Sequence, residues 1–221
     1  MIIDNTYFKG EIYIPHAKPS VVSVGDGVSD EIITFINEYE KEALLSCLGF
    51  QLYKEFVSNI DLTEPTLINA NADQKWDSLM NGLEYTNSRG KFVSWPGIRY
   101  KNPGSETYSS FLAYYVYFFY ESQNYVIKTN AMSSVPKSKN GDTVVPNQAI
   151  TLAWRKFYKM TQNDFCEPQY IENRWGLGID YYRNNGQVGF YEFIENQNDL
   201  QKDTYGNFQP KNWENLNQFG I

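Results

Sequence analysis

The sequence predicts a mainly α-helical fold, a helical bundle with an extended N-terminal arm and a long irregular C-terminal segment. Seven of the nine residues at 111–119 are aromatic or β-branched, and polar residues flank this run closely. The run is too short for a bilayer-spanning helix, which needs about 20 apolar residues. Apolar residues also recur every three or four positions across 29–48 and 147–164, as in amphipathic helices. We therefore expect no membrane span and a central helix that is packed on nearly all sides.

Residues 1–28 are predicted to form the extended arm and a loop. The first 14 residues mix β-branched and aromatic side chains in partial alternation, which is typical of an edge strand. Pro15 and Pro19 interrupt this pattern, and a Gly-Asp-Gly sequence breaks the chain before the first helix.

The helical bundle domain is predicted over residues 29–170. Ser29 or Asp30 is suited to cap its first helix, which continues to the break at Gly49. A second helical segment follows immediately. Its apolar side chains are predicted to share one face: Leu52, Tyr53, Phe56, Val57 and Ile60.

Further along the bundle domain, residues 61–72 are predicted to form a loop and 73–82 a short helix that ends near a glycine. Residues 84–104 contain three glycines and two prolines, so a loop is expected there. Trp95 and Ile98 are the side chains predicted to anchor this loop to the core.

The central helix is predicted to span residues 105–128, with Tyr114, Tyr117 and Phe118 in the bundle core. Each tyrosine there offers an apolar ring and a hydroxyl that needs a polar partner. A polar loop over 129–146 then leads to the last clear helix. The apolar face of that helix is predicted to contain Ile150, Ala153, Trp154, Phe157 and Tyr158.

Residues 171–221 form the predicted C-terminal segment. It is too aromatic for a solvated disordered tail and too irregular for one helix. We expect it to lie extended on another surface, supplied by the same chain or by a partner. The aromatic residues predicted to make interface contacts are Trp175, Tyr181, Tyr182, Phe190, Phe193 and Trp213, together with Tyr7 and Phe8 of the arm. Removal of residues 173–221 is expected to leave a folded helical domain that no longer assembles.

Composition limits the function classes. The net charge of −7 argues against a protein that wraps nucleic acid, because that requires clustered lysine and arginine. Aromatic residues make up 17% of the chain, which fits either partner contacts or an aromatic-rich monomer core. The first residues lack the pattern of a signal peptide, so a cytoplasmic location is the default expectation.

The inventory of catalytic residues is small, and we predict a protein that is not an enzyme and has no cofactor or metal. The chain has one histidine, His16, in a predicted loop. Cys47 and Cys166 lack the spacing of a metal site and are interpreted as buried free thiols. Glu38, Glu40 and Glu42 alternate along a helix, which predicts a solvated face more readily than a pair of catalytic carboxylates. A carbohydrate-active hydrolase and a glycan-binding module remain the alternatives.

Several blocks of the sequence together point to one family. They are TYFKGEIYIP (6–15), LLSCLGFQLYKEF (44–56), KWDSLMNGLEYT (75–86), SWPGI (94–98), SSFLAYYVYFFYES (109–122), AWRKFYKM (153–160) and the terminal FGI. This pattern resembles the head-completion, or connector adaptor, proteins of tailed phages and prophages of Bacteroides-type hosts, including crAss-like phages. It covers most of residues 1–170 and contains no catalytic signature.

The resemblance implies a small helical bundle whose copies form a ring, typically dodecameric, beneath the portal. Such a ring extends the DNA channel, which DNA crosses without specific binding, and offers the tail a docking surface. The implied partners are other copies of the chain, the portal and neighbouring tail or connector proteins. The implied location is the virion, assembled in the cytoplasm of the host bacterium. Extended arms in such adaptors reach onto the portal or a neighbouring copy, so 1–20 and 173–221 are the candidates here.

Overall fold

The structure is a computed structural model that describes residues 1–14, 27–61, 64, 68–101, 108–124, 127–128, 133–134, 147–162 and 187–214. Its fold is mainly helical, as predicted. Among the described residues, no helix combines the length and the apolar character needed to cross a bilayer.

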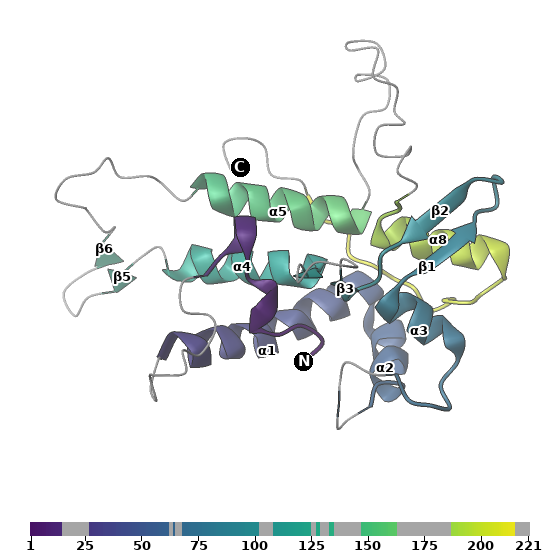
Figure 1. The fold of residues 1–221 in the computed structure, drawn as a ribbon, viewed down its shortest axis with the longest axis horizontal. Coiled ribbons are helices and arrows are strands. Elements are labelled where there is room, and N and C mark those ends of the chain that lie inside the picture. The colour runs from purple at the N-terminus through teal and green to yellow at the C-terminus, as the bar shows by residue number, and fades with distance from the viewer. Residues whose placement is uncertain are drawn as a thin grey trace, which may run out of the picture.

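Three long helices lie side by side and form the body of the fold (Figure 1). They are α1 (Gly27–Leu48), α4 (Phe111–Asn124) and α5 (Asn147–Gln162). Helix α4 lies between the other two and contacts both along its length (Figure 1). Every side chain from Phe111 to Tyr117 is buried, so the prediction of a helix packed on nearly all sides is confirmed.

Helix α4 is shorter than the predicted span of 105–128. Two short antiparallel strand pairs flank it. Strands β3 (Tyr100–Lys101) and β4 (Tyr108–Ser109) precede the helix, and β5 (Ile127–Lys128) and β6 (Ser133–Ser134) follow it.

The tyrosines of α4 bury their rings, and the hydroxyls of Tyr114 and Tyr115 donate to carboxylates. Tyr114 and Tyr117 are buried, and the half-buried Phe118 packs against the Trp154 ring at 4.8 Å between centroids, in agreement with the predicted core. The Tyr115 hydroxyl donates to Glu42 Oε1 at 2.9 Å, and that of Tyr114 donates to Glu11. Burial, reinforced by the carboxylate acceptor, raises the pKa of both phenols, so both remain protonated donors at neutral pH.

The break between α1 and α2 (Phe50–Ser58) occurs at Gly49, as predicted. Gly49 has φ +81°, and a Cβ at this position would lie 2.6 Å from the carbonyl oxygen of Gln209. The Gln209 amide donates to the Leu48 carbonyl at 3.2 Å, so the chain 160 positions later runs directly over this break. Two features therefore favour glycine at position 49: the positive φ and the close approach of the Gln209 backbone.

Helix α3 (Gln74–Asn81) begins after a capping aspartate and ends at a glycine, and both residues are recognisable in the sequence. The Asp73 side chain accepts from the Lys75 amide, and Gly82 ends the helix with φ +99°. The loop expected over 84–104 is instead partly a hairpin of β1 (Leu83–Thr86) and β2 (Phe92–Trp95) in antiparallel register. The predicted anchors Trp95 and Ile98 are both buried, and Trp95 Nε1 donates to the Leu79 carbonyl at 3.1 Å.

Gly97 is the position where an added methyl group should be most disruptive. Gly97 has φ +91°, and a Cβ there would lie 2.6 Å from the carbonyl carbon of Asn81. We expect Gly97→Ala to lower the free energy of unfolding by about 2–4 kcal/mol, from backbone strain plus overpacking. Gly90 is the matched control, since it has φ +74° but open space around it, so Gly90→Ala should cost only about 1 kcal/mol. Equal losses in urea unfolding would contradict this packing.

The N-terminal arm is not an extended strand. Its described part contains two short 3₁₀ helices, η1 (Asn5–Tyr7) and η2 (Gly10–Ile12), which pack onto the helical layer. Its apolar side chains are in the core: Ile2, Ile3, Tyr7, Phe8, Ile12 and Ile14. The alternation of apolar residues that suggested an edge strand thus reflects burial in irregular backbone.

The described part of the C-terminal segment is also not extended. Helix α8 (Phe190–Leu200) packs against α5 and lies behind the β1–β2 hairpin (Figure 1). The chain then returns across the fold through residues 201–214, where Tyr205 and Trp213 are buried. Arm, helical layer and α8 contribute to one hydrophobic cluster.

Candidate functional site

The predicted interface aromatics that the structure describes are all buried within this chain. Tyr7, Phe8, Phe190 and Phe193 each expose 2% or less of their surface, and Trp213 exposes 7%. Almost all of the surface of these five rings is covered within this chain, so the contacts described here are contacts with its own core. Trp175, Tyr181 and Tyr182 lie outside the described residues, as do His16 and Cys166.

The rings of α8 are covered by aromatic residues from distant parts of the sequence. Phe193 stacks on Trp95 with centroids 5.5 Å apart and planes at 19°, and Phe190 contacts Phe111 at 5.2 Å. The spacing of Phe190, Phe193 and Ile194 at i, i+3 and i+4 is a helical signal that the sequence reasoning missed.

Trp213 packs against aromatic side chains of helix α5. Its ring lies edge-on to Trp154 and Phe157, at 5.7 and 5.2 Å between centroids. The Trp213 indole donates to the Tyr191 hydroxyl at 3.1 Å. Burial raises the pKa of the neighbouring Cys47 thiol to about 12, so this thiol is protonated and structural rather than nucleophilic.

The acidic pattern at 38–42 is only partly a solvated face. Glu38 and Glu42 are exposed, but Glu40 exposes only 8% of its surface. The Glu40 carboxylate accepts from the Ile2 and Ile3 amides at 2.8–2.9 Å, because the arm folds over this side of α1. Glu40 is thus an anchor for the arm, which corrects the expectation of a solvated side chain.

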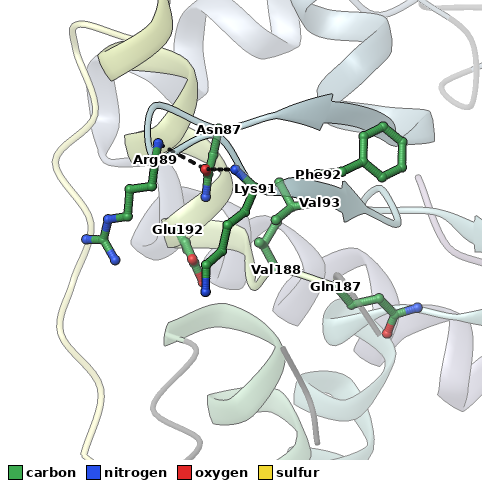
Figure 2. A pocket seen from close by; sticks show the side chains of 8 residues that line it. All are labelled: Asn87, Arg89, Lys91, Phe92, Val93, Gln187, Val188 and Glu192. Atoms are coloured by element: carbon green, nitrogen blue, oxygen red, sulfur yellow. Dashed lines mark hydrogen bonds between the residues drawn. The ribbon is translucent and has the colours of Figure 1, made fainter. Parts of the chain in front are cut away.

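A small pocket lies between the β1–β2 hairpin and the start of α8 (Figure 2). The buried Asn87 side chain closes the hairpin turn, because it accepts from the Arg89 and Lys91 amides, both at 3.0 Å. Arg89 and Lys91 in this turn are both exposed and positively charged. Val93 and Val188 supply apolar lining, and Gln187, Glu192 and Phe92 also line the pocket (Figure 2).

The pocket is small and has few groups that could act in catalysis. Its volume of about 120 Å³ is well below the roughly 300–1,000 Å³ of typical small-molecule sites. Glu192 is the single carboxylate in its lining, whereas glycoside hydrolysis requires two. Within the described ranges, no group of three His, Cys, Asp or Glu side chains is placed to hold a metal ion.

Large apolar side chains are exposed at several places on the surface. Phe50 at the start of α2 is 69% exposed, Phe92 on β2 is 67% exposed and Tyr13 after η2 is 60% exposed. Leu152 on α5 is 49% exposed. Scattered single residues of this kind are common on monomers, so exposure alone does not define a site.

Comparison of the chain with family models, with curated proteins and with solved structures finds no match.

Proposed function

We propose that this chain is a structural virion protein, a ring-forming adaptor of the phage head–tail connector that docks to the portal and extends the DNA channel. The proposal begins from the sequence blocks that resemble connector adaptors. These blocks coincide with elements that define the fold, namely the break at Gly49, helix α3 with β1, the turn at Gly97, and helices α4 and α5. The resemblance therefore involves residues that build the fold, and it identifies no catalytic or ligand-binding site.

The observation that carries the proposal is the division of charge over the outer helices. Helix α1 contains five acidic residues and one lysine, whereas α5 contains three basic residues and no acidic one. The two helices lie on either side of α4 (Figure 1). A ring assembled head to tail requires two different complementary patches on each subunit, and this division offers them.

The overall charge is also compatible with a DNA conduit. A net charge of −7 repels phosphates on average, so DNA would pass a ring of such chains without adhering. In this proposal the partners are other copies of the chain, the portal, and neighbouring tail or connector proteins. The location is the virion, after assembly in the cytoplasm of the host bacterium.

The test is the composition of purified virions of the phage that encodes this chain. We expect mass spectrometry to find the chain in multiple copies per particle. Cryo-electron microscopy should place it in a ring at the neck, between portal and tail. Absence of the chain from virions that contain their complete head and tail proteins would overturn the proposal.

A further inference from the structure

One side of α1 carries three glutamates, of which Glu38 and Glu42 are exposed and Glu31 is half-buried. Glu31, Glu38 and Glu42 are spaced i, i+7 and i+11, which places them on one side of a helix over about 17 Å. The opposite side of α1 is buried against the core through Ile32, Ile36 and other apolar residues. We call Glu31, Glu38 and Glu42 the acidic stripe.

One side of α5 carries a basic stripe of Arg155, Lys156 and Lys159, of which Lys156 is exposed and the other two are half-buried. Ala153, Trp154, Phe157 and Tyr158 occupy the buried side of the same helix. Lys156 Nζ lies 3.4 Å from Glu11 Oε1, but both side chains are about half exposed, so solvent screens this ion pair.

Exposed apolar groups accompany the basic stripe. Leu152 precedes Lys156 by four positions on the same side of α5 and is 49% exposed. Tyr13, 60% exposed, immediately follows η2, which contacts α5 and contains Glu11, the ion-pair partner of Lys156. These two side chains provide apolar surface that a charged patch alone lacks.

We propose that the basic stripe of one copy docks onto the acidic stripe of a second copy, with Leu152 and Tyr13 covered in the contact. The two stripes lie on helices on either side of α4 (Figure 1). A contact that uses one stripe of each copy leaves the second stripe of each copy for a further copy, which joins the copies head to tail. The charges set register and association rate, and the covered apolar groups supply much of the affinity. This inference rests on the self-assembly part of the proposed function.

A charge-exchange experiment on the full chain tests this contact. One variant carries Glu31→Lys and Glu38→Lys, and the other carries Lys156→Glu and Lys159→Glu. Glu42 is left intact because it accepts from the Tyr115 hydroxyl. Each variant alone brings like charges together at the contact, so its self-association should weaken about tenfold or more. Mass photometry with and without the portal measures this self-association.

Mixing the two variants gives the decisive result. In an alternating assembly every contact again joins a basic to an acidic stripe, so the equimolar mixture should regain assembly that neither variant shows alone. A mixture that remains unassembled, or single variants that assemble like wild type, would overturn the inference while leaving the proposed function standing. Wild-type chain that fails to assemble even with the portal would instead count against the proposed function.

Neutral substitutions keep the test informative if a reversed variant does not fold. Glu38→Gln and Lys156→Gln each remove one charge from an exposed position. Both should weaken the dependence of assembly on salt between 50 and 500 mM, because fewer charges are then screened at the contact. Thr34→Gln, on the exposed side of α1, is the control and should leave the salt dependence unchanged. The same salt dependence in all three variants and wild type would contradict the proposal.

Discussion

Deletion of residues 187–221 is expected to leave a polypeptide that does not fold cooperatively. The deletion removes side chains that are buried in the common core: Phe190, Phe193, Ile194, Tyr205 and Trp213. Truncation of one large buried side chain costs about 2–5 kcal/mol, so loss of all five costs about 10–25 kcal/mol, which matches or exceeds the roughly 5–15 kcal/mol that stabilises a typical domain. Circular dichroism during heating should show no cooperative transition.

Two point variants in α8 isolate the cause of this loss. Phe193→Ala should lower the free energy of unfolding by about 3–5 kcal/mol, because its fully buried ring stacks on Trp95. Leu200→Ala, at the 46% exposed end of the same helix, should change it by less than about 0.5 kcal/mol. A truncated chain that melts like the full chain would show that residues 187–221 are not part of the hydrophobic core. It would support the expectation that they contact a partner.

Replacement of Glu40 is expected to detach the N-terminal arm from α1. Glu40→Ala leaves the Ile2 and Ile3 amides without their buried acceptor and opens a cavity, so we expect a loss of about 3–5 kcal/mol in urea unfolding. Glu38→Ala, two residues earlier and exposed, is the control and should be nearly neutral. Equal effects of the two substitutions would mean that the arm is not held by Glu40.

The same carboxylate predicts a pH dependence of stability. Burial raises the pKa of Glu40, although the Ile3 and Ile2 amides and the positive N-terminus partly oppose this shift. Between the ordinary glutamate pKa of 4.5 and the raised pKa of the folded state, the folded state binds more protons than the unfolded state. Stability from this group is fully present below that value and is lost as pH rises through the folded pKa.

Glu40→Gln, which cannot titrate, tests that sign. It should remove this part of the pH dependence, so the difference in unfolding free energy between wild type and variant should shift in favour of the variant as pH rises through the folded pKa. A difference that stays constant, or that shifts in favour of wild type, would contradict a raised pKa.

Elements with a regular apolar period could be predicted from the sequence alone. Helices α1, α3 and α5 follow from spacings of three and four residues, and the break at Gly49 follows from glycine itself. The identity of α4 as a central helix follows from aromatic residues around its whole circumference. These signals are local, and tertiary contacts do not override them.

The errors arose where tertiary contacts decide the structure. The arm adopts 3₁₀ turns because its apolar residues are covered by α1 and its amides find Glu40, an acceptor 37–38 positions away. The acidic alternation suggested a solvated face because nothing local indicates that the arm will cover Glu40. Helix α8 is an 11-residue element with Gly, Asn and Gln residues on both sides, and this composition indicates irregular structure in the sequence. For that reason the sequence alone places its aromatic side chains in a partner contact rather than in this core.

The mass of the particle that the full chain forms with a portal protein, the partner proposed for it, is the most direct test of ring assembly. Light scattering at physiological salt should find a portal complex heavier by many copies of this 25.7 kDa chain. Cryo-electron microscopy of that complex should show copies joined head to tail, α5 of one beside α1 of the next. A chain that stays a 25.7 kDa monomer and leaves the mass of the portal unchanged would contradict ring assembly.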